Sequence, residues 1–396
     1  MSVERVGVVG AGTMGSGIAQ LACLGGYATV IQDPDPAAIE AGSERVVDSL
    51  AKGVRREMWS AEDAGAAGNR LEGVADLDGL AGCDLVIEAA PENLALKQGL
   101  FAELAEACGP EAILASNTSS LPVTAIGART PRPERVVGMH FFNPPALMEL
   151  VEVVATADSS AEALAATTEV GRRMGRTPIR AMDSPGFIAN RLARPYSLES
   201  LRMLADGVAD AATIDRACRL GGGFRMGPFE LIDLIGLDVN LSVARSFYAQ
   251  GGAPERWRPS EIQERMVDEG LRGRKNGRGF YSYAAGPHRE RDLDLGISAP
   301  TLDPDELAAI DPAAVEIVPR LIAQIANEAA FALEEEVGSP EDMNTAMRLG
   351  FNWPLGPLEF TELIGAGRSV DLLENLQRDH GEAYAPAPGL LGLAGR

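Results

Sequence analysis

A short apolar segment, residues 6–9, leads directly into the glycine-rich loop at residues 10–15, and a helical pattern follows. A strand, a glycine loop and a helix in that order are typical of a dinucleotide-binding unit. Gly10 permits the tight turn, Gly12 lets a pyrophosphate approach the backbone, and Gly15 allows close packing of helix on strand. The free N–H groups at the helix N-terminus attract phosphate. The loop therefore predicts a parallel α/β sheet that binds a dinucleotide.

An acidic residue follows at the distance that such a loop requires. Asp33 ends a second apolar segment, residues 28–32, twenty-one positions after Gly12. A carboxylate there accepts the ribose hydroxyls and repels a 2′-phosphate, so NAD is favoured over NADP. The alternative, a glycine turn without a nucleotide, is disfavoured because strand, loop, helix and acid occur together. The residues predicted to contact the cofactor here are Gly10, Gly12, Thr13, Met14, Gly15 and Asp33.

Strand and helix patterns alternate over the first half of the chain, which predicts a parallel, doubly wound sheet. The further strand candidates are residues 84–88, 112–115 and 136–139. Residues 147–154 alternate less clearly and are a candidate late strand, with antiparallel pairing as one option. Residues 37–70 are polar, charged and helical, and we interpret them as a helical excursion from the sheet.

After Asp183 the strand signals stop and helical patterns take over. The expected helices are residues 187–205, 212–220, 228–234 and 239–249. The segment 284–314 contains Gly, Pro, His and Asp with little periodicity, which is typical of a linker. We therefore expect a nucleotide-binding domain at 1–183, a helical domain at 184–283, this linker, and a second helical domain at 315–396.

The two helical domains resemble each other. Residues 191–238 and 320–367, aligned with an offset of 129 and no gap, are identical at 15 of 48 positions. The clearest match pairs MGPFELIDLIG at 226–236 with LGPLEFTELIG at 355–365. Chance would give only a few identities, so the sequence predicts a duplicated all-α domain.

The bulk properties exclude several classes of partner. A formal net charge of −22 and a pI near 4.6 argue against nucleic acid, which needs a basic face, and against an anionic membrane. No apolar run approaches the ~20 residues that span a bilayer, and the N-terminus lacks the pattern of a signal peptide. The four cysteines, Cys23, Cys83, Cys108 and Cys218, lack metal-like spacing and indicate reduced core residues. We expect a cytoplasmic protein without a metal.

Candidate catalytic residues lie in the second half of the predicted sheet. His140 is one of only three histidines and sits in an apolar, proline-terminated segment. Glu152 on the next strand could reach the imidazole and fix its tautomer, as a general base requires. Ser119 follows the strand at 112–115, at the sheet edge where ligands bind in open α/β folds. The alternatives are a structural histidine, a solvated carboxylate and a helix N-cap cluster.

Asn190 begins the helical half. Its amide could hydrogen-bond a substrate oxygen across the cleft between domains, although a polar residue on a helix face is the alternative. The repeat places Pro319 at the equivalent position of the second copy. Because proline has no such amide, only the first copy can carry a site of this kind.

Six segments in the same order and spacing resemble the 3-hydroxyacyl-CoA dehydrogenase family over nearly the whole chain. They are residues 10–15, 116–121, 140–144, 150–153, 185–191 and 274–281. Both Gly-Pro-x-Glu helices are similar too, and the doubled helical domain resembles the long bacterial, 3-hydroxybutyryl-CoA dehydrogenase-like members. The resemblance implies a Rossmann-like doubly wound α/β sheet, followed by two all-α domains related by duplication.

The resemblance also implies roles for individual residues. His140 would be the catalytic base with Glu152 as its partner, and Ser119 and Asn190 would hold the substrate oxygen. The residues implied near the cofactor are Glu92, Lys97, Asn117 and Asn143, of which Asn143 would also shape the substrate pocket.

A coenzyme A site is implied near the helical excursion. Lys52, Arg55 and Arg56 would contact its phosphates there, and a solvated helix face is the equal alternative. Two departures from the family weaken the substrate assignment: Glu149 replaces the usual lysine, and the excursion after Arg56 is shortened.

The implied reaction is NAD-dependent oxidation of a (3S)-3-hydroxyacyl-CoA ester to the 3-ketoacyl ester, or its reverse. A short acyl chain such as 3-hydroxybutyryl is expected. Two alternatives stay open: a dehydrogenase of the same fold that acts on a hydroxy acid or sugar acid without coenzyme A, and a catalytically silent NAD-binding protein. The second helical copy could act as an internal dimer partner, and a homodimer of the whole chain is a further expectation.

Overall fold

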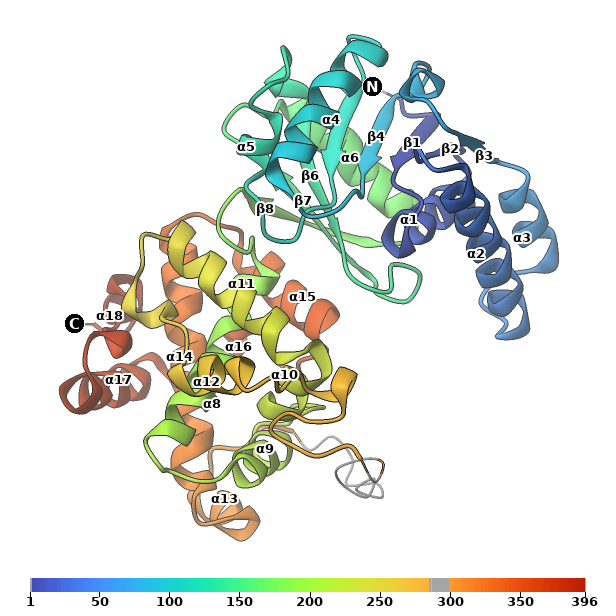
Figure 1. Cartoon of the computed structure of the whole chain (residues 1–396). Coiled ribbons are helices and arrows are strands. Elements are labelled where there is room, and N and C mark those ends of the chain that lie inside the picture. The colour runs from blue at the N-terminus through green and yellow to red at the C-terminus, as the bar shows by residue number, and fades with distance from the viewer. Residues whose placement is uncertain (1, 285, 287–298, 396) are drawn as a thin grey trace. The chain divides into compact units, whose positions relative to one another are not determined.

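The computed structural model describes residues 2–284, 286 and 299–395 (Figure 1). The chain forms two compact units, Met1–Phe187 and Ile188–Arg396. The strands, all in the first unit, are β1 (Arg5–Val9), β2 (Ala28–Gln32), β3 (Leu71–Val74), β4 (Leu85–Glu88), β5 (Ile113–Ser116), β6 (Val136–Phe141), β7 (Leu150–Ala155) and β8 (Thr177–Met182). Its α-helices are α1 (Thr13–Leu24), α2 (Pro36–Arg55), α3 (Ala61–Gly68), α4 (Leu94–Ala107), α5 (Val123–Gly127) and α6 (Ala161–Arg173).

The strands form one sheet in the order β3-β2-β1-β4-β5-β6-β7-β8. Every neighbouring pair is parallel except β6 and β7, which are antiparallel. The chain runs outward from β1 to β3 and then returns to the other side of β1 at β4. Ligands bind at such a topological switch point, outside the carboxyl ends of the strands. Ligand-binding residues are therefore expected in the loops after β1, β4, β5 and β6.

The predicted doubly wound sheet is confirmed, and so is the antiparallel option for the late strand. Two edge strands were not predicted. In β3 the sequence LEGV has no apolar run, and its middle residues Glu72 and Gly73 are exposed. In β8 the residues point alternately in and out, and Pro178 disguises the pattern. Edge strands bury less apolar surface, so their sequence signal is weaker.

The buried core follows from the sequence of the central strands. Their β-branched residues suit a pleated surface that is covered on both faces. Val6, Val8, Ile87, Ile113 and Val137 are all fully buried, and they pack with residues of α1 and α6 in one apolar cluster. This core fixes the strand ends from which the site residues project.

The second unit is helical. Its α-helices are α7 (Ala189–Leu192), α8 (Arg194–Ala205), α9 (Ala211–Leu220), α10 (Pro228–Ile235), α11 (Leu237–Gln250), α12 (Glu261–Asp268), α13 (Pro304–Ile310), α14 (Ala314–Glu334), α15 (Pro340–Phe351), α16 (Pro357–Ile364), α17 (Ala366–His380) and α18 (Pro388–Leu393). The central helix α14 packs against α8 and α9 as well as α16 and α17, so the two predicted copies share one core.

Two predictions about this unit need correction. The single helix expected over 187–205 begins only at Ala189, because Phe187 has a positive φ of 50°, and it is divided into α7 and α8, because Pro195 opens a new helix. The expected linker at 284–314 contains the helix α13, which Asp303 caps by accepting from the N–H groups of Asp305 and Glu306. Residues 285 and 287–298 of that linker lie outside the described residues.

Buried arginines join the two predicted helical copies reciprocally. Arg191, fully buried, donates to Glu328 at 2.7 Å and to Glu335 at 2.7 Å. At the equivalent place in the other copy, Arg320 donates to Glu199 at 2.5 Å and to Asp206 at 2.7 Å.

Each central carboxylate also receives a hydrogen bond from an aromatic side chain. Trp257 Nε1 donates to Glu328 at 3.0 Å, and Tyr384 Oη donates to Glu199 at 3.1 Å. Each cluster thus combines a buried arginine, two carboxylates and an aromatic donor.

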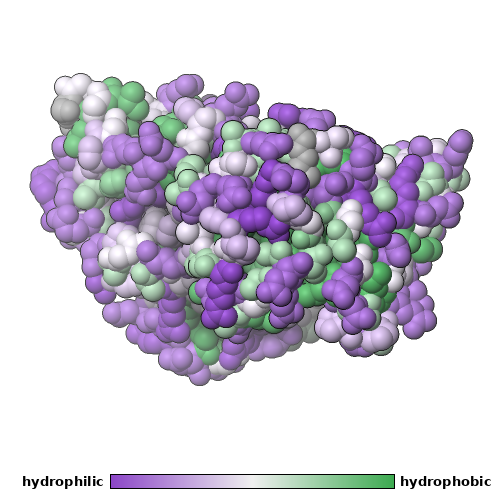
Figure 2. Space-filling view, turned by 90° about the horizontal axis from the view of Figure 1, so that it is seen from above, coloured by the Kyte–Doolittle hydropathy of each residue, from purple (hydrophilic) through white to green (hydrophobic). Residues whose placement is uncertain are grey.

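One face of the molecule is predominantly polar. In Figure 2 hydrophilic residues cover most of the face in view, with hydrophobic residues in small groups between them. None of the described helices is both long enough and apolar enough to cross a membrane. Cys23, Cys83, Cys108 and Cys218 are free and buried, as predicted.

Candidate functional site

The glycine loop after β1 has the conformation that the sequence predicts. Gly10 has φ +97°, and a Cβ atom there would lie 2.9 Å from the Ala89 carbonyl oxygen on the neighbouring strand end. A Cβ atom on Gly15 would lie 1.7 Å from the Gly10 carbonyl oxygen, so only glycine fits. Around Gly12, which caps α1, there is open space. The loop thus leaves backbone N–H groups accessible at a helix N-terminus, as a pyrophosphate requires.

Asp33 lies next to this loop. Its Oδ2 accepts a hydrogen bond from the Ala11 N–H at 3.0 Å, and its Oδ1 accepts from Asp35 N at 3.1 Å. Arg45, which sequence reasoning missed, donates to the Ala11 carbonyl at 2.5 Å and to Ser16 Oγ at 3.3 Å. These contacts fix the loop from the side of α2. No local pattern identifies Arg45, because it comes from a helix 34 positions further along the chain.

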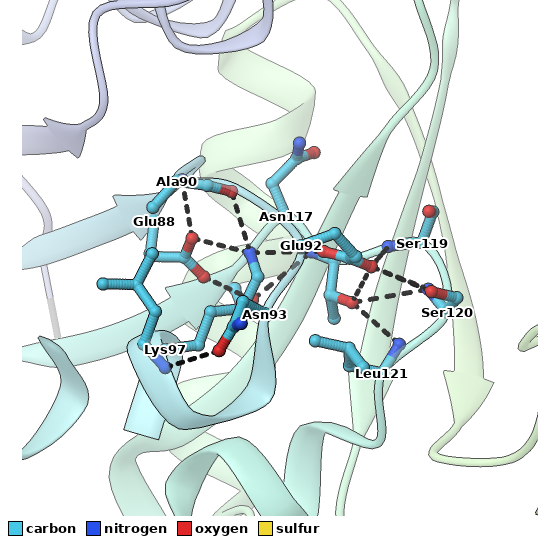
Figure 3. Close-up of polar contacts among 12 residues, drawn as sticks. Glu88, Ala90, Glu92, Asn93, Lys97, Asn117, Ser119, Ser120 and Leu121 are labelled. Atoms are coloured by element: carbon cyan, nitrogen blue, oxygen red, sulfur yellow. Dashed lines mark hydrogen bonds and ion pairs between the residues drawn. The ribbon is translucent and has the colours of Figure 1, made fainter. Parts of the chain in front are cut away.

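A buried polar cluster lies at the carboxyl end of β4 (Figure 3). Glu88, fully buried, accepts from Lys97 Nζ at 2.6 Å and from the Ser116 hydroxyl at 2.7 Å. Lys97 is itself only 1% exposed and lies 3.4 Å from a Glu92 oxygen. The predicted cofactor residue Lys97 therefore holds two carboxylates in place. Glu88 was missed, although an acid that ends an apolar strand is a usable signal.

Glu92 organises the loop after β5 (Figure 3). Its Oε1 accepts from the Thr118 hydroxyl at 2.6 Å, from Ser119 N at 3.1 Å and from Ser120 N at 3.2 Å. Burial alone would raise the pKa of this carboxyl group. The Thr118 hydrogen bond and the Lys97 charge outweigh burial and lower the pKa below its ordinary value. Glu92 is thus ionised and fixes the backbone of Ser119.

His140 and Glu152 form the predicted contact. They are directly opposite each other in the antiparallel pair β6–β7, and His140 Nδ1 lies 2.7 Å from Glu152 Oε2. Glu152 is fully buried and His140 is 5% exposed. The imidazole packs against the rings of Phe142 and Phe187, at centroid distances of 4.6 and 5.9 Å. The solvated-carboxylate alternative for Glu152 is therefore wrong.

The remaining predicted residues of the first unit differ in their surroundings. Asn117 accepts from the Phe141 N–H at 2.8 Å and so ties the loop after β5 to the end of β6. Asn143 is exposed just beyond β6. The carboxyl ends of β1, β4, β5 and β6 lie at one edge of the sheet, which brings the glycine loop, Glu92, Ser119 and His140 to that edge.

The predicted coenzyme A residues lie on the helical excursion. Lys52 and Arg55 are in the last turn of α2, and Arg56 caps it. All three are exposed, and none has an ion-pair partner in the described part of the chain. Cations in a last turn also interact favourably with the helix dipole, so the structural alternative stays open. Asn190 lies in α7 of the second unit and is half-buried.

Comparisons with known proteins cover almost the whole chain. The NAD-binding domain model of the 3-hydroxyacyl-CoA dehydrogenase family matches residues 5–184. The C-terminal domain model of that family matches residues 186–283 and 317–393.

Individual relatives agree with these matches. The chain is 36% identical to 3-hydroxyadipyl-CoA dehydrogenase of Escherichia coli K12, over 98% of this chain and 96% of that protein. It is 41% identical to a probable 3-hydroxybutyryl-CoA dehydrogenase of Deinococcus radiodurans, over 70% of this chain and all of that one. The crystal structure of 3-hydroxybutyryl-CoA dehydrogenase from Escherichia coli K12 superposes with a TM-score of 0.90 at 35% identity, covering 100% of this chain and 98% of that one.

Proposed function

The chain belongs to the 3-hydroxyacyl-CoA dehydrogenase family, and from that premise we propose how its residues carry out the reaction. It is an NAD-dependent enzyme that interconverts 3-hydroxyacyl-CoA and 3-ketoacyl-CoA esters. The open space at Gly12 and the Asp33 carboxylate suit the pyrophosphate and ribose of NAD. When bound, NAD supplies the hydride acceptor for C3 of the substrate.

In the proposed mechanism His140 is the general base. Its Nδ1 donates to Glu152, so the lone pair is on Nε2. Nε2 takes the proton of the C3 hydroxyl group, and Ser119 and Asn190 donate hydrogen bonds to the oxygen as it becomes a carbonyl. The 2.7 Å contact between His140 and Glu152 is the observation that carries the proposal.

Replacing His140 by glutamine tests this mechanism. General acid–base catalysis contributes roughly 10²–10⁴ in rate, so H140Q should lose at least that factor in acetoacetyl-CoA reduction by NADH. Binding of NADH, followed by fluorescence, should persist. The control is H380Q, at the second histidine that the structure describes. Turnover of H140Q near the wild-type value would exclude His140 as the base.

We propose a short acyl chain on coenzyme A as the substrate, with Lys52, Arg55 and Arg56 near its phosphates. The relatives named for 3-hydroxybutyryl-CoA and 3-hydroxyadipyl-CoA support this. Two exposed charges contribute up to ~1 kcal/mol each, so R55Q/R56Q should raise the KM for acetoacetyl-CoA roughly five- to thirtyfold. An unchanged KM would favour a hydroxy acid without coenzyme A. The free, buried cysteines support a reducing, cytoplasmic location.

We also propose that the second helical domain is a duplicate that serves as an internal dimer partner. The reciprocal pairs support this, because Arg191 and Arg320 are 129 positions apart and so are Glu199 and Glu328. A local contact repeats with the same offset. Asp215 accepts from Phe229 N at 2.8 Å, and its counterpart Asn344 accepts from Leu358 N at 3.0 Å.

This arrangement is the self-complementary pattern of a two-fold interface, in which each side supplies the partner that the other needs. The two matches to the C-terminal domain model support the same interpretation. A homodimer of whole chains is the alternative assembly, and measurement of the molecular mass in solution distinguishes the two.

A further inference from the structure

Arg194, the first residue of α8, is buried without a counter-ion. The side chain is 93% buried, and its Nε and Nη1 have no hydrogen-bond partner among the described residues. No carboxylate in the described part of the chain forms an ion pair with it. Its neighbour is the ring of Phe247, whose centroid lies 5.4 Å from Arg194 Cζ. A buried charge that lacks a counter-ion and leaves two of its nitrogens without hydrogen bonds costs several kcal/mol, so this arrangement calls for a functional explanation.

The surroundings of Arg194 lower the pKa of its guanidinium, and no neighbouring group raises it. Burial lowers the pKa of its guanidinium to about 10, and no nearby carboxylate opposes this effect. The contrast with Arg191 is direct. Burial also acts on Arg191, but Glu328 and Glu335 more than compensate and raise its pKa. Arg191 is therefore a satisfied structural residue. Arg194 still carries its charge at neutral pH and has no anion next to it.

Comparison of the two helical copies separates structural from functional positions. The arginine of the buried pair occurs in both copies, as Arg191 and Arg320. The unpaired Arg194 has Ala323 as its counterpart, and Asn190 has Pro319. The copy that lacks the proposed substrate amide thus also lacks the unpaired guanidinium. The absence of both side chains from the second copy is consistent with two residues that contact the same ligand in the first copy.

The spacing of the two residues suggests the length of the ligand. Asn190 in α7 and Arg194 at the start of α8 are four positions apart, and Ala193 between the two helices keeps a right-handed helical backbone, so the two residues are about 6 Å apart at 1.5 Å per residue. Three carbon–carbon bonds of about 1.5 Å separate C3 of an acyl chain from C6, a span of roughly 4 Å when extended. Because a guanidinium recognises a carboxylate through paired hydrogen bonds, an acid group at C6 suits this distance.

We propose that Arg194 binds the terminal carboxylate of a dicarboxylic 3-hydroxyacyl thioester with an acyl chain of about six carbons. This inference rests on the proposed function, because Asn190 must hold the C3 oxygen of the same molecule. Arg194 is then a specificity residue, and the substrate supplies the counter-ion that the protein lacks. Esters that end in a methyl group leave the guanidinium buried and unpaired, and the enzyme discriminates against them.

Two substrates of equal length test the proposal. 3-Hydroxyadipyl-CoA and 3-hydroxyhexanoyl-CoA differ only in the terminal carboxylate, so any contact to coenzyme A or NAD cancels in their ratio of kcat/KM. The wild-type enzyme should prefer the dicarboxylic ester at least 100-fold. In R194M, which keeps the bulk of the side chain but not the charge, this ratio should fall by about two orders of magnitude. R194K should give an intermediate ratio, because lysine offers charge without the planar fork.

Control measurements separate the possible failures. N190A should lower kcat for both esters by a similar factor, and the melting temperature of each variant shows that it is folded. A wild-type ratio near one, or R194M rates that fall equally for both esters, would overturn the role of Arg194 alone. Absence of NAD-dependent turnover of either ester by the wild-type enzyme would overturn the proposed function as well.

Discussion

Replacing Arg320 by methionine gives the most direct test of the internal two-fold interface. Arg320 is 1% exposed and donates to Glu199, Asp206 and the Tyr384 hydroxyl at 2.5, 2.7 and 2.6 Å. Loss of the guanidinium leaves the fully buried carboxylate of Glu199 without its main partner. Removing one side of a buried ion pair costs about 3–5 kcal/mol in unfolding free energy.

The lower end of that range applies here. Glu199 retains Arg202 at 3.2 Å and the Tyr384 hydroxyl at 3.1 Å, so we expect a loss of about 3 kcal/mol. For a unit of this size each kcal/mol lowers the melting temperature by about 2–4 °C, which gives a shift of roughly 6–12 °C. The double variant R320M/E199L should recover at least half of the loss, since it removes the uncompensated charge.

The assay combines calorimetry with turnover, and R191M is the matched comparison. Arg191 occupies the equivalent place, but its helix turn also carries Asn190, whereas the turn before Arg320 carries Pro319. Both variants should be destabilised by similar amounts, and turnover at 20 °C should fall at least tenfold in R191M only. A melting temperature of R320M within 2 °C of wild type would refute the reasoning, because the pair would then contribute no stability.

Two further variants test local features of the two units. Alanine at Gly15 would place its Cβ atom 1.7 Å from the Gly10 carbonyl oxygen, so G15A should abolish NADH binding in a fluorescence titration, whereas G109A, with nothing within 4 Å, should bind normally. Burial raises the pKa of Asp215 from 3.8 to about 7, so the folded state binds the proton more tightly than the unfolded state and wild-type stability falls as pH rises from about 4 to 7. D215N places at position 215 the residue type of Asn344. Its free energy of unfolding should therefore increase relative to that of wild type over that range, by up to about 4 kcal/mol, in denaturant titrations at pH 4, 5.5 and 8. A difference in unfolding free energy that does not change with pH would contradict the raised pKa of Asp215.

Much of the fold could be predicted because its signals are local. The strand, loop and helix around Gly10 and the apolar strands that follow have patterns within a few residues of each other. The edge strands β3 and β8 could not be predicted, since they bury little and Pro178 interrupts one of them. The late start of α7 depends on the backbone at Phe187, whose positive φ no pattern indicates.

Some residues of the candidate site could likewise be predicted from the sequence, and others could not. His140 and Glu152 could be paired from sequence because they lie on consecutive strands, and the contact is present at 2.7 Å. Arg45 was missed because its partners come from another element, and only the folded chain brings them together. Arg194 was also missed, although the alignment of the two copies contains the signal. In that alignment Arg194 of the first copy corresponds to Ala323 of the second copy.

The antiparallel register of β6 and β7 has a consequence for how this enzyme can diversify. The proton acceptor and its acidic neighbour belong to two strands that are buried along their whole length, so they are preassembled whenever the sheet is intact. The residues proposed to distinguish one ester from another lie on α2, α7 and α8, outside these two strands. New substrate preferences can therefore arise by single replacements on helices while the chemistry is inherited unchanged.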